Sequence, residues 1–508
     1  MKSNALDIVT SVATFIGRVN GVSHQKLSIG ANSMQLQLLT FQNFQGFKGN
    51  QHAKLAPITL IFGPNASGKS SIGRALRVFK QTVGLPDQLF DVDQVWDGPS
   101  IKMRNKSKIV FRQLNEGDAP AIMGLGYTFA LDATSDWPGI ASISAFFSEN
   151  VVLPGQYLAF LSLNLEAGVL AHLDDRISRI VFAVGSDGSF SYVQPTGGED
   201  HALNQLLEIG INAGAKWFHP MLGAPSNWVG DWEKLLAGQN PGIFDNQIHW
   251  GEFNKPDSYI DLAIDLPDGE RSAFSYIGSL ASMFGEKSKN WFSQHTHIDA
   301  IRKPPEELDV EEMSGAEFAA GRVEVLDQKS RDLNVLLHKL TDGRFQIKKE
   351  HTYSPEQEFL ITQTHVTDMF TSTTLTFQEV GTGIGQVYPI LDQLIYGTGS
   401  LFVEEPEIHL HPKMQADLMD AFIDAVKTMP TRQFLIETHS ESMLLRLQRR
   451  IREGKINVQD VSVLYVDAVT NDSNEKFNAI TEFQMDDVGD LIDPFPESFA
   501  GLRIQDLL

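Results

Sequence analysis

The sequence contains no cysteine among its 508 residues. This absence excludes disulfide bonds, thiolate metal sites and cysteine nucleophiles, and it is compatible with the cytoplasmic location that we expect. Long apolar runs are missing too. Asp7 and Arg18 interrupt the apolar stretch near the N-terminus, so we expect neither a signal peptide nor a membrane span.

Positive charge is also scarce. The chain has 41 Lys and Arg against 64 Asp and Glu, a formal net charge of −23. Because nonspecific binding to nucleic acid depends on many cationic contacts with phosphate, this balance argues against a protein that coats DNA. A local DNA groove stays open, although a solvated face explains a basic cluster equally well. Basic residues gather in two stretches: Lys102, Arg104, Lys106, Lys108 and Arg112, and Arg446, Arg449, Arg450, Arg452 and Lys455.

The chain does contain a complete phosphate-binding loop after an apolar run at residues 58–62. The loop reads Gly63, Pro64, Asn65, Ala66, Ser67, Gly68, Lys69 and Ser70, and Ser71 follows it. Glycines let backbone N–H groups approach phosphates, Lys69 reaches the β and γ oxygens, and the Ser70 hydroxyl ligates magnesium. Residues 70–83 then predict a helix whose positive end faces the same anion. The loop therefore predicts a nucleoside triphosphate with magnesium.

A second apolar run, residues 400–403, ends in the paired carboxylates Glu404 and Glu405. In a site of this form the first acid helps to hold magnesium, and the second orients or deprotonates the attacking water. Neighbouring side chains of a strand point to opposite faces, so both acids reach one site only where the backbone turns. Pro406 favours such a turn. An acidic strand cap followed by a solvated turn is the alternative.

A third apolar run, residues 434–436, leads into Glu437, Thr438, His439 and Ser440. A histidine at a strand end beside a magnesium triphosphate can sense the γ-phosphate by hydrogen bonding, which makes His439 a switch candidate. A polar group satisfied by its surroundings is the other interpretation.

The order of these motifs resembles that of ABC-type ATPases of the RecF, SMC and OLD (overcoming lysogenization defect) group. The resemblance rests on residues 63–70, 381–386, 404–412 and 437–440, and residues 297–302 are similar to a family segment that carries an arginine near the nucleotide. It implies an α/β fold, an ABC-ATPase head with a P-loop sheet, an antiparallel β subdomain and a large central insertion. Since the chain ends about seventy residues after His439, we expect no Toprim nuclease domain.

The same resemblance implies ATP as the ligand and a homodimer or higher homo-oligomer. Each ATP would lie between one subunit's phosphate loop and the partner's signature motif, here Gly381, Gly383, Gly385 and Gln386. The family's signature serine is Gly385 in this chain, and its Walker B aspartate is Glu404. Both departures predict slow hydrolysis, with ATP acting as a clamp between subunits.

Two functions remain after these comparisons of motifs. The first is an ATPase, with Glu405, His439 and Lys69 in catalysis and Ser70 and Glu404 at the metal, that controls a DNA-processing or antiphage effector. The alternative is an ATP-gated scaffold or sensor with little hydrolysis. In both, the effector, a nuclease or toxin, is a separate chain, DNA is a possible partner and no membrane is involved.

Shifts in pattern divide the chain into four parts. We expect an N-terminal helical arm at residues 1–33, the two parts of the ATPase head at 34–150 and 331–508, and an insertion, lid or dimerisation region at 151–330. Individual patterns predict further elements: a strand in which Leu36, Leu38 and Phe41 alternate, a turn at 43–47, a hairpin at 180–193, one long helix at 311–340 and a last strand at 461–466.

Overall fold

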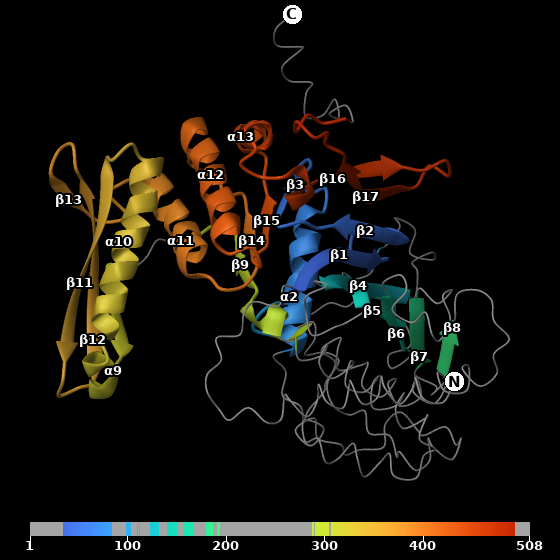
Figure 1. The fold of residues 1–508 in the computed structure, drawn as a ribbon, viewed down its shortest axis with the longest axis horizontal. Coiled ribbons are helices and arrows are strands. Elements are labelled where there is room, and N and C mark those ends of the chain that lie inside the picture. Colours follow the sequence, from blue (N-terminus) through green and yellow to red (C-terminus); the bar gives the residue numbers. More distant parts are fainter. Residues whose placement is uncertain are drawn as a thin grey trace, which may run out of the picture. The chain divides into compact units, whose positions relative to one another are not determined.

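The computed structural model describes residues 34–83, 98–102, 109, 111, 122–131, 140–150, 157–165, 179–185, 190–193, 287–288, 290–303 and 306–492. The expected arm at 1–33, all of the region at 194–286 and four residues of the first basic stretch lie outside the described residues. The chain divides into two compact units, Met1–Gln51 with Ala75–Ser293, and His52–Arg74 with Gln294–Leu508. Figure 1 shows the described elements in sequence colours.

Six strands of the first unit belong to a seven-stranded sheet in the order β2-β1-β4-β5-β6-β7-β8, and β2 spans the boundary between the units at Gln51. Neighbours from β1 to β8 pair antiparallel, and the pairing of β7 with β8 confirms the strands of the hairpin expected at 180–193. The strands are β1 (Met34–Gln42), β2 (Asn50–Lys54), β4 (Ile122–Leu131), β5 (Ile140–Asn150), β6 (Tyr157–Leu165), β7 (Arg179–Gly185) and β8 (Phe190–Val193).

Strand β1 departs from the simple alternation that its sequence predicts. Leu36 and Phe41 are buried as expected, but Leu38 is only half-buried and Leu39 is buried instead. The register with β4 shifts between Leu36 and Leu38. An extra residue in one strand of a pair moves the following side chains to the other face, so the expectation for Leu38 was wrong.

The second unit contains a six-stranded sheet in the order β17-β16-β3-β15-β14-β9. Its strands are β3 (Ile58–Phe62), β9 (Thr296–Ile298), β14 (Leu401–Glu404), β15 (Phe434–Glu437), β16 (Val461–Thr470) and β17 (Lys476–Phe483). The five strands from β16 to β9 are parallel, and only β17, which the sequence patterns missed, is antiparallel. Carboxyl ends of parallel strands share one edge, so the phosphate loop and the ends of β14 and β15 meet there.

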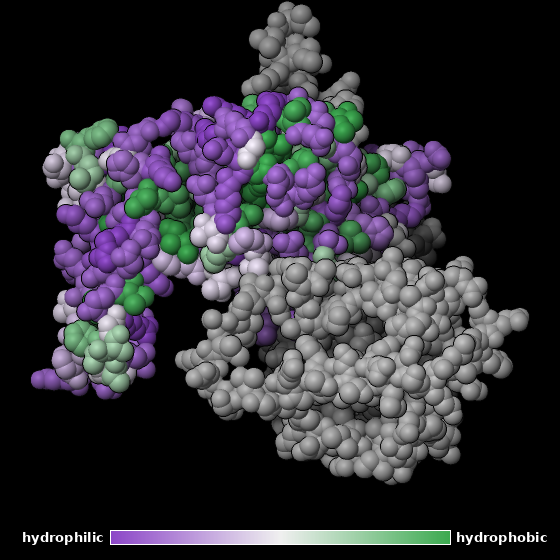
Figure 2. All heavy atoms as spheres, in the orientation of Figure 1, coloured by the Kyte–Doolittle hydropathy of each residue, from purple (hydrophilic) through white to green (hydrophobic). Residues whose placement is uncertain are grey.

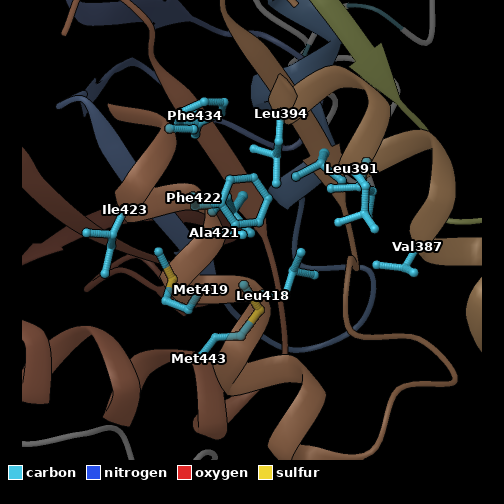
Figure 3. Packing of buried hydrophobic residues seen from close by; sticks show 14 of the residues in the cluster. Val387, Leu391, Leu394, Leu418, Met419, Ala421, Phe422, Ile423, Phe434 and Met443 are labelled. Carbon is cyan, nitrogen blue, oxygen red and sulfur yellow. The ribbon is translucent and has the colours of Figure 1, made fainter. Parts of the chain in front are cut away.

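Helices α2 (Lys69–Val83), α11 (Thr382–Tyr396), α12 (Pro412–Thr428) and α13 (Glu441–Arg452) accompany these strands. Figure 3 shows Leu394 of α11 and Phe422 of α12 in the same buried cluster as Phe434 of β15, and the rings of Phe422 and Phe434 meet edge to face at 5.4 Å. The α/β fold with a parallel sheet is therefore confirmed. Among the described residues, none of the helices has the length and apolar character needed to cross a membrane.

The second unit also holds an antiparallel sheet, β10-β12-β11, in which β13 pairs with β12. Its strands are β10 (Leu308–Glu312), β11 (Phe345–Ser354), β12 (Phe359–Asp368) and β13 (Thr373–Leu375). The single helix expected at 311–340 was wrong. Ser314 caps a short α9 (Gly315–Ala319), and Gly321 at φ 80° separates it from α10 (Arg322–Leu340). In Figure 2 mostly hydrophilic residues cover this region.

Candidate nucleotide-binding site

The phosphate loop follows β3 and has a backbone that favours glycine. Gly63 and Gly68 have φ of 149° and 98°, and Ala66 also lies in the left-handed region. A Cβ on Gly63 would lie 2.0 Å from the carbonyl oxygen of Val466, so only glycine fits. The Ser67 hydroxyl is buried and, within the described part of the chain, has no hydrogen-bond partner. The loop thus encloses a polar atom that an anion would satisfy.

The other loop residues lie as the motif requires. Asn65 and Ala66 form the exposed tip, and Ser71 is buried in the first turn of α2, where its N–H donates to the carbonyl oxygen of Gly68 at 3.0 Å. Helix α2 therefore begins at the end of the loop.

Lys69 is 4% exposed and lies under the loop. Its Nζ donates to the carbonyl oxygens of Gly63 and Pro64, both at 2.9 Å, and lies 4.0 Å from Oε1 of Glu437. Burial lowers the pKa of Lys69, and the negative charge of Glu437 is the largest effect that opposes it. A further anion at this place would stabilise the ammonium.

Glu437, at the end of β15, is the acid that contacts Ser70. The Ser70 hydroxyl donates to Oε1 of Glu437 at 3.2 Å, and Glu437 is 5% exposed. Among the described residues, its Oε2 has no partner. Burial, followed by the charge of Glu404, raises the pKa of Glu437 to about 7. No role was expected for Glu437 from the sequence, although it ends an apolar strand just as Glu404 does.

Glu404, the expected metal ligand, ends β14 in register with Glu437. Its Oε1 lies 3.0 Å from Nε2 of His297, and Oδ1 of Asp299 lies 3.6 Å from the same nitrogen. The His297 ring stacks on Phe402 with centroids 4.9 Å apart. Of the contacts between described residues, none joins the Glu404 side chain to Ser70 by a hydrogen bond. Glu404, His297 and Asp299 together offer ligand atoms that a cation could use.

Glu405 stands where the backbone turns after β14, as predicted. Its φ is 43°, and its N–H donates to the carbonyl oxygen of Glu437 at 2.7 Å. Arg302 donates from one Nη to the carbonyl oxygens of Glu404 and Glu405, the latter at 3.2 Å. This turn lets adjacent side chains of one strand serve the same site.

Arg302 is 6% exposed, so its guanidinium is almost fully desolvated. Within the described residues its Nε and second Nη have no partner. Burial lowers the pKa of Arg302 to about 10, against the charges of Glu407 and the paired acids. The residue remains a cation at neutral pH, with two nitrogens left to donate to an anion.

His439 follows β15 and is exposed. Its N–H donates to Oε1 of Glu407 at 2.6 Å, which fixes the backbone of the histidine. Partial desolvation and then the charge of Lys69 lower the pKa of His439. The imidazole is therefore neutral at pH 7 and keeps a nitrogen that can accept a hydrogen bond.

The signature residues lie around the start of α11. Gly381, at φ 89°, is exposed and precedes the helix, and Gly385 is buried. A Cβ on Gly383 would lie 2.9 Å from the carbonyl oxygen of His409. Gln386 accepts from the Arg302 N–H at 3.1 Å and donates to the Arg302 carbonyl oxygen at 2.7 Å. The side chain of Gln386 is thus hydrogen-bonded within its own subunit, to the backbone of Arg302.

Two protein families match the segments of the chain that form this edge of the sheet. Residues 58–143 match the family described as "AAA domain, putative AbiEii toxin, Type IV TA system", and residues 397–444 match the family described as "AAA ATPase domain". The first match contains the phosphate loop and the second contains the ends of β14 and β15. Both segments are thus similar to AAA ATPase domains.

Several SMC head structures are similar to this chain. The Smc head of Pyrococcus furiosus, solved with an extended coiled coil and the C-terminal domain of ScpA, is 12% identical, with 93% of this chain and 99% of that chain covered and a TM-score of 0.42. The SMC head of Thermotoga maritima is 10% identical, covers 89% and 100%, and has a TM-score of 0.35. The Smc head of Pyrococcus yayanosii is 10% identical, covers 89% and 97%, and has a TM-score of 0.41.

The residues at this edge fit a magnesium triphosphate. Buried polar atoms that the described part of the protein leaves without partners include donors, on Ser67 and Arg302, and an acceptor, on Glu437. Phosphate oxygens would satisfy the donors, and a divalent cation would satisfy the carboxylate. Native proteins rarely leave such atoms unsatisfied, so a ligand of mixed charge explains them together.

Proposed function

We propose that this ATPase binds ATP with magnesium and hydrolyses it, and that two subunits close around the nucleotide to control a separate effector protein. The convergence of the phosphate loop, Glu405, Glu437, Arg302 and His439 at one sheet edge supports this function. These groups come from distant parts of the chain, and the parallel strand order alone brings them together.

Each group has a role that its surroundings favour. Lys69 would neutralise charge on the β and γ phosphates, and Ser70 would hold a magnesium ion, whose charge would stabilise the phosphoryl group. Glu405 accepts a proton from the attacking water, because the turn at φ 43° brings its side chain to the end of β14. The neutral His439 orients that water or senses the γ-phosphate by hydrogen bonding.

The signature region supports slow turnover. Gly385 has no hydroxyl for a γ-phosphate across a dimer, and Gln386 is already bound to Arg302. The exposed backbone at Gly381, ahead of an uncapped helix, remains for the partner subunit's nucleotide. A contact made mainly by backbone N–H groups binds charge but adds no side-chain donor in the transition state.

The second basic stretch does not favour DNA as a direct partner. Arg450 Nε lies 2.6 Å from Asp420, Arg449 Nε lies 2.7 Å from Glu453, and Arg446 pairs with both Asp417 and Asp420. Pairing within the chain leaves little positive charge for phosphates. A nuclease or toxin effector fits better, and one matched family is described with a type IV toxin–antitoxin system.

The test measures ATP turnover and oligomeric state in the same samples, for wild type and Glu405→Gln. We expect turnover to fall at least about a hundredfold, because a general base contributes about 10² to 10⁴ in rate, while an ATP-dependent dimer accumulates. Glu311→Gln, the same change at a partly exposed residue of β10, is the control and should behave as wild type.

Wild-type turnover by Glu405→Gln would exclude this residue as the base. ATP binding without turnover in either protein would favour the gated scaffold, and capture of partner chains would then be the next experiment. A wild type that binds no ATP would contradict both functions.

A further inference from the structure

The metal-binding carboxylate of a phosphate-loop site is identified by its distance from the loop serine, since both groups must approach one small cation. The structure offers two strand-ending acids for this role. Strand β15 lies between β3 and β14, so Glu437 is one strand closer to the loop than Glu404.

The contacts distinguish the two acids. Ser70 donates to Oε1 of Glu437 at 3.2 Å, and Nζ of Lys69 lies 4.0 Å from the same oxygen. The other oxygen of Glu437 is buried and, within the described residues, has no partner. This side chain is more than nine-tenths buried and has an acceptor atom left beside the two loop residues that bind the phosphates and the metal.

Glu404 makes its side-chain contacts on the side away from the phosphate loop. Its Oε1 lies 3.0 Å from His297 Nε2, and the His297 ring is held by stacking on Phe402. The side-chain contacts of Glu404 among the described residues therefore lead toward β9. A carboxylate bound by a neighbouring imidazole is a support for other groups, as metal sites often require.

We propose that Glu437, together with Ser70, holds the magnesium ion of the bound nucleotide, and that Glu404, anchored by His297, supports the edge without binding the metal directly. This inference rests on the proposed binding of magnesium ATP. It moves the metal-binding role from the acid that the sequence motif indicates to one that lies next to the loop in space.

The experiment measures the affinity of a fluorescent ATP analogue in magnesium and in EDTA, for wild type, Glu437→Gln, Glu404→Gln and the partly exposed control Glu311→Gln. In Glu437→Gln we expect the magnesium-dependent gain in affinity to fall at least about tenfold, as loss of a group at a metal site commonly does. Its affinity in EDTA should be unchanged or higher, because a negative charge beside the phosphates is removed.

Glu404→Gln should keep the magnesium-dependent gain to within about threefold. Electron paramagnetic resonance of free Mn²⁺ in the presence of ADP gives a second readout, and Mn²⁺ affinity should fall in Glu437→Gln but not in the control. Glu437→Ala serves as the second variant if the glutamine variant does not fold, and the same losses are expected.

A magnesium-dependent gain that persists in Glu437→Gln, or that is lost only in Glu404→Gln, would overturn the inference while leaving ATP binding intact. Absence of analogue binding by the wild type would instead reject the proposed function itself. Binding in EDTA by every variant separates a lost metal contact from a lost fold.

Discussion

Two sheets of the same compact unit differ in how their charged side chains are buried and paired. At the carboxyl edge of the parallel sheet, Lys69, Arg302 and Glu437 are buried, and two of them carry polar atoms that the described residues leave unpaired. On the antiparallel sheet, Arg322 pairs with Glu311 at 3.3 Å and with Glu317 at 2.7 Å, and the three side chains are partly exposed, at 40%, 37% and 47% respectively.

The difference has a physical cause. A charge in water needs no partner, so an exposed ion pair contributes little to stability. A buried charge has lost its hydration and is costly until a counter-charge and hydrogen bonds replace it. The buried charges at the carboxyl edge of the parallel sheet therefore lower the stability of the folded protein, and a bound magnesium triphosphate would offset this loss. The charged residues of the antiparallel sheet cause no such loss, which favours a structural role or a surface for partners.

Lys69→Ala tests the parallel sheet, where the larger effect is expected. We expect affinity for magnesium ATP to fall about a thousandfold or more, roughly 4 kcal/mol, because a buried ammonium contacts the phosphates with little competition from water. Isothermal titration calorimetry measures the loss. Lys339→Ala, an exposed lysine of α10 that lies 4.0 Å from Asp424, is the matched control and should bind ATP as wild type does. Equal loss in both variants would show that the burial of Lys69 has no special role.

The phosphate loop, the paired carboxylates and the turn after β14 could be predicted because each depends on a short segment. Gly63, Lys69 and Ser70 stand at fixed spacing, and Pro406 favours a turn directly after Glu405. The fold class followed from the order of these segments along the chain. The catalytic roles of these residues remain predictions, although the structure brings them to one edge.

Glu437 could not be assigned from sequence because its importance depends on which strands are neighbours. An apolar strand that ends in Glu occurs twice, at Glu404 and Glu437, and only the sheet order places one of them beside Ser70. The long helix at 311–340 failed for a local reason, since Gly321 at φ 80° ends one helix before the next begins. Strand β17 was missed because its residues are mostly half-buried, so its apolar pattern is weak.

Glu437→Gln has a second expected effect, on stability without nucleotide or metal. The pKa of Glu437 is raised from its ordinary value near 4.5 to about 7, so the folded protein binds this proton more tightly than the unfolded chain. Stability is therefore lost as pH rises from about 4.5 through 7, and the full loss of about 3 kcal/mol is present above that range. Glutamine does not titrate. The variant should be about 3 kcal/mol more stable than wild type at pH 8.

Thermal unfolding in EDTA at pH 8 and at pH 5 measures this effect. We expect the unfolding temperature of Glu437→Gln to exceed that of wild type by several degrees at pH 8 and by much less at pH 5. A difference that is the same at both pH values would mean that burial of the carboxylate is not its cause.

The smallest effect is expected on the antiparallel sheet. Glu311→Gln removes the same charge from a partly exposed residue of β10 whose partner, Arg322, keeps Glu317 at 2.7 Å. Solvent screens such pairs, so the unfolding temperature should change by about 1 °C or less at either pH. Differential scanning fluorimetry alongside Glu437→Gln compares the two sheets under one condition. A shift in Glu311→Gln as large as that in Glu437→Gln would mean that the two sheets do not differ in the energetic cost of their charged side chains. The polar atoms without partners at the parallel edge would then not indicate a ligand site.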